Sequence, residues 1–342
     1  MNNEQDLSIF SIRTDLIIDD KSIADKEYNK TTIYDGIIVS ELIINEKNRS
    51  VINKEEGTYI TIEFNDITDS ENRNKVCEVL TEQIGKILKM MNIKGDDECI
   101  IIGLGNSKST PDSLGPKVLD NIIITKHLFE LNKVSQGFRM VSIFAQGVKG
   151  TTGLETADLI TSIVKEIKPK FIIAIDALAS SSIERLNHTI QMTNTGIHPG
   201  SGVGNQRKEI SFKTLGIPVL AIGVPTVVES STIVSDTINY LFKHISYTKN
   251  NFEISKLSVH HNNYKNKLEN IKLNKEEEHN LLGLLGDLDS NEKHQLITEV
   301  LEALDYNLMV CPKEVDFLID KLSIVIANSL NNSLHRQINS LE

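Results

Sequence analysis

The chain has 342 residues, of which 39% are hydrophobic and 24% are charged, a balance typical of a soluble globular protein with one large domain or two smaller ones. Its 47 Asp and Glu residues outnumber 36 Lys and Arg residues, which gives a formal net charge of −11. A negative field repels polyphosphate, and with no tryptophan and 5% aromatic residues the chain has no obvious stacking platform for nucleic acid. We therefore expect no direct nucleic-acid partner.

The cysteines and the N-terminus indicate the compartment. Cys77, Cys99 and Cys311 are far apart, odd in number and without CxxC spacing, so neither a disulfide framework nor a zinc cluster is expected. The first residues lack the basic and apolar regions of a signal peptide, and no apolar run approaches the roughly 20 residues that cross a bilayer. The sequence predicts a cytoplasmic protein with no membrane partner.

The N-terminal part of the chain predicts antiparallel strands followed by a helix. Polar and apolar residues alternate over 37–44 and 59–63, as they do in half-buried strands. From Lys75 to Met91 the apolar residues recur at helical spacing, which predicts a helix.

Strand and helix patterns then alternate up to about residue 245. Apolar runs predict buried strands, and helical spacing separates them; the strands are expected at 100–105, 140–144, 171–176 and 218–224, and the helices from about 116, 155 and 230. This alternation predicts an α/β fold with a mostly parallel sheet and helices on both faces. Residues 246–280 resemble a polar insertion, and the spacing from Val315 to Leu334 predicts a long amphipathic helix packed on the parent domain or on another subunit.

Two aspartates are the first candidates for chemistry, because ligands bind beyond the carboxyl ends of parallel strands. Asp176 closes the apolar run at 171–176, and Asp112 lies in the loop after the run at 100–105. Two carboxyls that face one cleft and share a proton can activate water and protonate a leaving group. The spacing equally allows purely structural roles, in which Asp112 caps a helix and Asp176 accepts backbone hydrogen bonds.

A glycine-rich loop at 195–205 is the second candidate. Its residues Gly200, Gly202 and Gly204 match neither a phosphate-binding nor a dinucleotide-binding spacing, so they predict a loop that approaches a substrate closely. His198 in this loop is a candidate proton carrier or metal ligand, or a polar residue that stabilises the turn. The chain has no HExxH and no GxSxG motif. We expect no cofactor and no bound metal.

Several motifs follow one another along nearly the whole chain. They include Ile12-Arg-Thr-Asp-Leu16, Gly103-Leu-Gly-Asn106, Thr110-Pro-Asp-Ser-Leu-Gly-Pro116, Ile175-Asp-Ala-Leu-Ala179 and Gly223-Val-Pro-Thr-Val-Val228. In this order they resemble the germination (spore) protease family, endopeptidases that degrade small acid-soluble spore proteins.

The resemblance implies a fold, an oligomeric state, a processing step and a catalytic site. The fold would be like that of hydrogenase-maturation proteases, in a homotetramer located in the spore core. A propeptide of residues 1–15 would be removed by the zymogen itself between Asp15 and Leu16, leaving a single peptidase domain of residues 16–342. The family's proposed catalytic aspartates match Asp112 and Asp176. The family has been classed as metallo-type and as aspartic-type, and the absence of a zinc motif favours the aspartate pair.

Two departures and two alternatives accompany this resemblance. The family usually carries an arginine where this chain has Ser181, so Arg185 or another cation would have to replace it. Residues 17–18 are both isoleucine where the family has small and acidic residues, which leaves the preference after the cleaved bond open. The alternatives are a peptidyl-tRNA hydrolase, suggested by Gly103-Leu-Gly-Asn106, and a non-catalytic binding protein assembled through its C-terminal helix.

Overall fold

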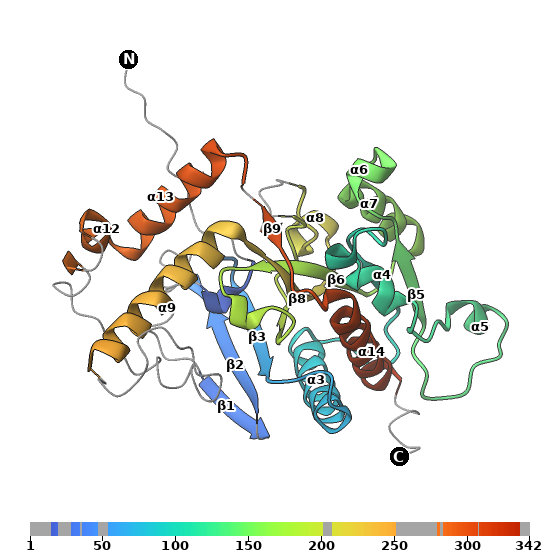
Figure 1. The fold of residues 1–342 in the computed structure, drawn as a ribbon. Helices are drawn as coiled ribbons and strands as arrows, with labels where there is room; N and C mark the ends of the chain where they lie inside the picture. The colour runs from blue at the N-terminus through green and yellow to red at the C-terminus, as the bar shows by residue number, and fades with distance from the viewer. Residues whose placement is uncertain are drawn as a thin grey trace. The chain divides into compact units, whose positions relative to one another are not determined.

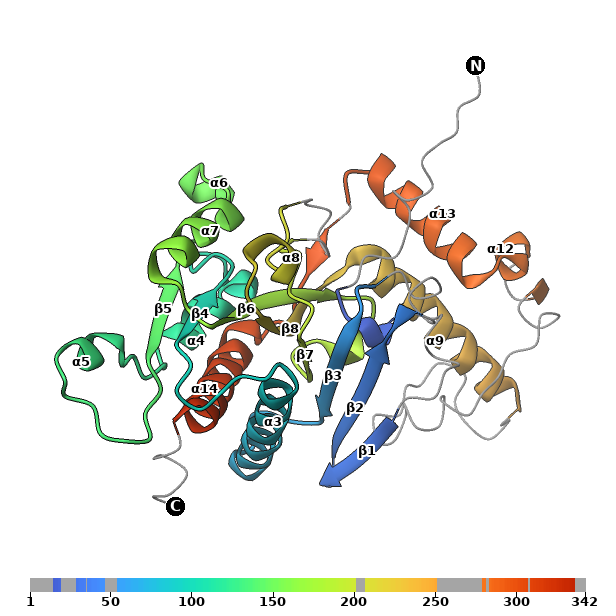
Figure 2. The same ribbon diagram turned by 180° about the vertical axis from the view of Figure 1, so that it is seen from behind.

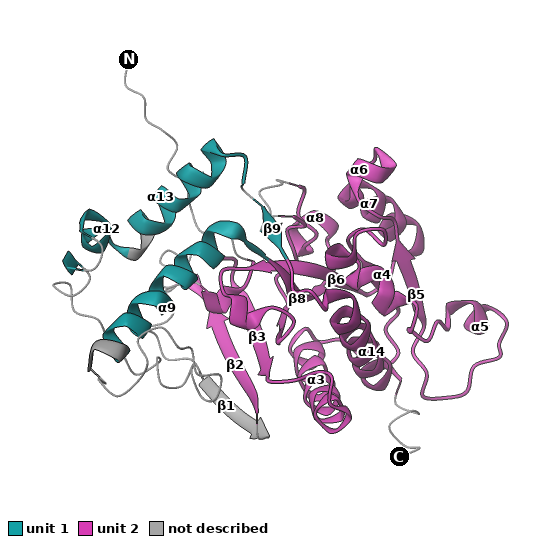
Figure 3. Ribbon diagram, in the orientation of Figure 1, with its two compact units in different colours: residues 1–12, 228–310 teal, residues 13–227, 311–342 magenta. Residues whose placement is uncertain are grey.

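The computed structural model describes residues 15–19, 29–34, 36–46, 54–200, 207–250, 279–280, 283–306 and 308–335. The chain divides into two compact units (Figure 3). One unit contains Arg13–Val227 and Cys311–Glu342, and the other contains Met1–Ile12 and Val228–Val310. Both candidate aspartates and the C-terminal helix belong to the larger unit.

The strands of the sheet follow the order β1-β2-β3-β7-β8-β6-β4-β5 (Figures 1 and 2). The antiparallel part contains β1 (Asn29–Tyr34), β2 (Ile37–Ile44), β3 (Gly57–Phe64), β7 (Thr189–Thr193) and β8 (Val219–Glu229). The parallel part contains β4 (Cys99–Gly103), with β5 (Val141–Ala145) on one side and β6 (Phe171–Ser180) on the other. The predicted α/β class is confirmed, and antiparallel pairing extends beyond the N-terminal strands because β7 joins β3 to β8.

Helices cover both faces of the sheet, as the apolar runs predicted. On β4 and β6, residues such as Ile101 and Ile173 belong to the core beneath α3 (Ser70–Met90), α4 (Leu114–Leu119) and α14 (Val315–Leu334). Their neighbours Ile100 and Ile172 belong to the opposite core, which contains residues of α7 (Thr156–Ile167) and a side chain packed from α8 (Phe212–Leu215). Since successive side chains of a strand point to opposite faces, a strand buried on both faces needs an unbroken apolar run.

The C-terminal helix packs within its own chain. α14 contacts α3 and α4, and its residues Leu322, Ile326 and Leu330 are buried in the shared core. Ser329 Oγ also lies 3.1 Å from the carbonyl oxygen of Cys77 on α3. Of the two partners that the sequence allowed, the parent domain therefore covers the apolar face of this helix.

The smaller unit is built around two helices that contact each other, α9 (Ser230–Asn250) and α13 (Ser290–Ala303). The short strand β9 (Met309–Val310) pairs antiparallel with Val228 and Glu229. α9 continues past residue 244, so the predicted insertion at 246–280 begins inside a helix, and its residues 251–278 lie outside the described ranges. α12 (Leu284–Asp287) completes the unit, while α5 (Lys126–Glu130) and α6 (Lys149–Thr152) belong to the larger one. Among the described helices, none has the length and apolar character required to span a bilayer.

Candidate active site

Asp112 ends a short 3₁₀ helix, η3 (Thr110–Asp112), in the loop that follows β4. Gly105 has a φ of +100°, and a Cβ on it would lie 2.1 Å from the Asp112 carbonyl oxygen, so only glycine fits there. The Asn106 N–H donates to that same oxygen over 2.8 Å. From β8, the Thr226 hydroxyl donates to the Pro111 carbonyl over 2.7 Å. These contacts hold Asp112 in the loop after β4 and against β8.

Asp176 lies within β6 and does not end it, which corrects the sequence prediction. The parallel pairing with β4 stops at Ile175, so Asp176 is the first residue beyond the paired segment. The strand, which also neighbours β8 in the sheet, continues to Ser180, and near its end the Asp15 N–H donates to the Ala179 carbonyl over 3.0 Å. The side chain of Asp176 is buried, and its Oδ1 accepts a hydrogen bond from the Ala177 N–H at 3.0 Å.

The structure brings these two carboxyls into one electrostatic environment. Burial raises the pKa of Asp176 well above its usual value, and the charges of Asp112 and Asp15 raise it further, against the opposing effects of the Ala177 N–H and of Arg207. Burial also raises the pKa of Asp112, again opposed by Arg207. The N-cap of α4 is Ser113, so Asp112 is not the helix cap that its spacing allowed.

The segment at the predicted cleavage site is bound next to Asp176. Besides its backbone contact, Asp15 accepts a hydrogen bond at Oδ2 from the Ala179 N–H at 2.9 Å. The side chain of Gln191 on β7 contacts the Asp15 carbonyl and the Ile17 N–H. Leu16 is fully buried. The Asp15–Leu16 peptide bond is therefore held from two strands.

The residues just after this bond are anchored by both apolar and polar contacts. Ile17 packs in a small apolar cluster with Leu42, Ile44 and Tyr59, so this chain accommodates isoleucine at a position where small or acidic residues were expected. In η2 (Ile17–Asp19), the Asp19 carboxylate accepts from the Ser181 N–H at 2.7 Å and the Ser180 hydroxyl at 3.0 Å.

Arg185, the cation that follows the second aspartate motif, binds the N-terminal segment at residues 15–19. Arg185 forms an ion pair with Asp19 and lies 3.6 Å from Glu63. Arg207 is instead the cation whose charge acts on Asp112 and Asp176. Arg185 thus anchors the N-terminal segment, and a residue from the glycine-rich region supplies the positive charge near the aspartates.

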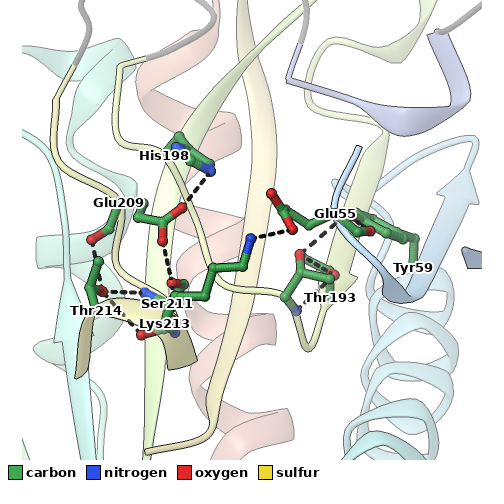
Figure 4. A network of polar contacts seen from close by, with 9 residues as sticks. Glu55, Tyr59, Thr193, His198, Glu209, Ser211, Lys213 and Thr214 are labelled. Carbon is green, nitrogen blue, oxygen red and sulfur yellow. Dashed lines mark hydrogen bonds and ion pairs between the residues drawn. The ribbon is translucent and has the colours of Figure 1, made fainter. Parts of the chain in front are cut away.

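A cavity of about 570 Å³ adjoins the bound segment and is lined by Asp15, Gln191, Tyr59 and His198, among others. His198 Nε2 lies 3.3 Å from Glu209 Oε2, and its side chain is 53% exposed (Figure 4). The loop carrying His198 therefore borders the cavity, as a substrate-binding loop would. Gly200 adopts a φ of +74°, whereas Gly202 and Gly204 lie outside the described ranges.

Polar contacts tie the walls of this cavity together (Figure 4). Lys213 Nζ lies 2.6 Å from Glu55 Oε2, and Glu209 accepts a hydrogen bond from the Ser211 hydroxyl at 2.8 Å. The Tyr59 hydroxyl donates to the Glu55 carbonyl over 2.9 Å. His198 has one acidic neighbour here, and within the described ranges no group of three or more His, Cys, Asp and Glu side chains is arranged to hold a metal ion.

Sequence reasoning missed three contributors to the site: Gln191, Arg207 and the Ala179 backbone. Gln191 lies in a strand whose polar and apolar residues are all buried, so it gave no half-buried alternation to detect. Arg207 gave only a short basic run with the lysine that follows it. The backbone groups of Ala179 carry no sequence signal at all.

An α/β fold that holds a peptide segment beside one buried and one half-buried carboxyl has the features of a peptidase. The family model described as germination protease matches residues 14–342. The chain is 44% identical to the germination protease of Priestia megaterium, with 99% of this chain and 97% of that protein covered. It is 46% identical to that of Bacillus velezensis, with 98% and 97% covered, and 42% identical to that of Bacillus subtilis, with 98% and 96% covered. The chain therefore belongs to the germination protease family.

One solved structure with a similar arrangement is the [NiFe] hydrogenase maturation protease HycI from Thermococcus kodakarensis. The similarity covers 42% of this chain and 80% of that chain, with a TM-score of 0.26 and 15% sequence identity.

Proposed function

We propose that this chain is a self-processing endopeptidase that starts the degradation of small acid-soluble spore proteins during germination. Membership of the germination protease family makes it a peptidase. The work would be done in the spore core by a homotetramer, after removal of residues 1–15. The observation that carries the proposal is the position of Asp15, which is hydrogen-bonded to Ala179 and close enough to raise the pKa of Asp176.

Asp112 and Asp176 would act as a pair that shares one proton. Burial and mutual repulsion both disfavour the doubly ionised state, which supports a singly protonated pair at moderate pH. The ionised carboxylate takes a proton from the water that attacks the peptide carbonyl carbon. The protonated carboxyl gives its proton to the leaving amine when the C–N bond breaks. The two pKa values belong to the pair, so neither role is assigned to one aspartate.

Cleavage after an acidic residue follows from the same contacts. The Asp15 carboxylate accepts a hydrogen bond from the Ala179 N–H, and an acidic residue of a substrate would occupy this place once the propeptide has left. A charge-assisted hydrogen bond of this kind contributes about 1.5–3 kcal/mol. An aliphatic side chain would leave the donor unsatisfied.

The aspartate pair is tested with Asp112→Asn and Asp176→Asn, which keep the side-chain volume and remove the titrating group. We expect each to slow the release of a chain starting at Leu16 by about 10²-fold or more, the contribution of general acid–base catalysis. Mass spectrometry of the intact protein over time measures this rate. Asp120→Asn, at an exposed position after α4, is the matched control and should process normally. Wild-type rates in both site variants would contradict the aspartate mechanism.

Substrate and assembly are tested on the processed protein. Purified small acid-soluble spore proteins should be cut at few bonds, and the new C-termini should be acidic. Casein serves as the unrelated substrate, and equal cleavage of casein at non-acidic residues would contradict the proposed specificity. Sedimentation at equilibrium measures the mass of the assembly, which should be four times that of the chain.

A further inference from the structure

Gln191 is a buried glutamine of β7 whose amide contacts the chain on both sides of Leu16. Its Nε2 lies 3.3 Å from the Asp15 carbonyl oxygen, and its Oε1 lies 2.7 Å from the Ile17 nitrogen. The carbonyl can only accept a hydrogen bond and the backbone N–H can only donate one. These two partners fix the orientation of the amide, with its NH₂ group toward Asp15.

The carbonyl that faces Nε2 belongs to the Asp15–Leu16 peptide bond. Ala179 holds Asp15 through two hydrogen bonds. Its carbonyl accepts from the Asp15 N–H, and its own N–H donates to the Asp15 carboxylate. The side chain of Gln191 is only 8% exposed, so little water competes for its amide. Gln191 therefore has its donor group aimed at the carbonyl oxygen of the bond next to the aspartate pair.

We propose that Gln191 is a catalytic residue whose Nε2–H stabilises the oxyanion formed at the cleaved carbonyl. The inference rests on the proposed function, because it takes Asp15–Leu16 as the bond that is hydrolysed. Water gives one proton to the ionised aspartate as its oxygen bonds to the Asp15 carbonyl carbon, and the carbonyl π electrons move to the oxygen that faces Nε2. The intermediate collapses by breaking the C–N bond, and the leaving Leu16 nitrogen receives the proton of the protonated aspartate.

The geometry suits a group that acts more strongly in the transition state than in the ground state. A neutral carbonyl 3.3 Å from Nε2 is bound weakly, whereas an oxyanion attracts the same donor strongly and shortens the contact. Catalysis requires this difference in binding. The shorter contact of Oε1 with Ile17 holds the side chain in place without interacting with the reacting atoms.

Gln191 can also act on substrate proteins other than its own chain. Gln191 lines the cavity beside the bound segment together with Asp15. A polypeptide that places an acidic residue against Ala179 would present its carbonyl to Nε2 in the same way. Gln191 would then serve both self-processing and the cleavage of substrate proteins.

Two substitutions in the full-length chain test the proposal. Gln191→Glu keeps the acceptor for Ile17 and removes the donor when the introduced carboxyl is ionised, while Gln191→Met removes both. We expect both to slow self-processing by about 10²- to 10³-fold, the effect of losing one oxyanion donor. As the pH is lowered toward about 5, the introduced carboxyl becomes protonated and can donate its O–H. The processing rate of Gln191→Glu should then approach the wild-type rate at the same pH, whereas the rate of Gln191→Met should stay as far below it as before.

Gln83→Met is the matched control, because Gln83 is an equally buried glutamine on α3. Thermal unfolding of each variant shows whether it has folded. Wild-type processing in both folded Gln191 variants would overturn the proposal. If Asp112→Asn and Asp176→Asn abolish processing in the same experiment, only the role of Gln191 fails. If the aspartate variants also process at the wild-type rate, the proposed function fails as well.

Discussion

At the scale of single residues, ionising Asp176 costs free energy that its surroundings only partly offset. The side chain is buried beside two other acidic residues, with one backbone N–H and the charge of Arg207 opposing the effect. A structural aspartate in such a place would be expected to have a dedicated cationic partner. The raised pKa instead keeps a proton available on the pair, which supports a catalytic role.

Asp176→Asn should stabilise the folded protein near neutral pH. Because the folded pKa lies above the unfolded one, the native protein binds more protons between the two values, and its stability falls as the pH rises through this range. The asparagine side chain does not ionise, so it avoids this loss of stability, and its oxygen can still accept the hydrogen bond from the Ala177 N–H. The melting temperature of the variant should exceed that of the wild type at pH 7, and the difference should vanish below about pH 3.9, the unfolded pKa.

Asp120→Asn provides the comparison at an exposed aspartate and should leave the melting temperature nearly unchanged at every pH. A lower melting temperature for Asp176→Asn at pH 7 would show that the ionised carboxylate is stabilising. The raised pKa, and with it the shared proton, would then be wrong.

At the scale of elements, the sequence located β4 and β6 well but not β7. A strand buried on both faces by apolar side chains is visible as a continuous run, as in residues 171–176. In β7, Gln191 and Thr193 are buried although polar, because Gln191 binds the N-terminal segment and Thr193 contacts Thr195. The contact of Gln191 with Ile17 spans 174 residues of sequence and cannot be inferred from the local pattern. The apolar runs that precede Asp112 and Asp176 in the sequence marked both aspartates as candidates, while the groups that hold the peptide left no such mark.

Close packing of α4 on β4 and β6 places η3 and its aspartate. A Cβ on Gly115 would lie 2.3 Å from the Leu104 carbonyl oxygen and 2.7 Å from that of Ile175, both of them backbone atoms. Gly115→Ala should therefore push the helix away and cost about 1–3 kcal/mol of unfolding free energy. The midpoint of urea unfolding measures this loss, and self-processing should slow because Asp112 moves.

Gly85→Ala is the control for this prediction, since nothing lies within 4 Å of a Cβ added at that position of α3. It should stabilise the protein by about 0.5–1 kcal/mol through helix propensity alone. If Gly115→Ala were as stable and as active as Gly85→Ala, the close approach of α4 to the strand ends would not be what positions Asp112.

At the scale of the whole molecule, the order of motifs predicted the family, and the division into two units was not foreseen. The boundary at Val228 falls inside β8, a strand of largely buried residues, so no polar linker composition marks it. The described segment around the predicted cleavage site lies in the larger unit together with Asp112 and Asp176. The proposed zymogen would therefore hold its own cleavage site as a bound substrate.

Self-processing should therefore be a first-order reaction of each chain. The Asp15–Leu16 bond is held by Ala179 and Gln191 of the same chain, so no encounter between molecules is needed. The half-time should stay constant when the protein is diluted about 100-fold, because a bound group at high effective concentration outcompetes other molecules. Mass spectrometry of the products over time measures it. A processed wild-type protein mixed with full-length Asp176→Asn should cleave that variant slowly, because its cleavage site is occupied by its own contacts. A rate that falls in proportion to dilution would instead place the cut between chains.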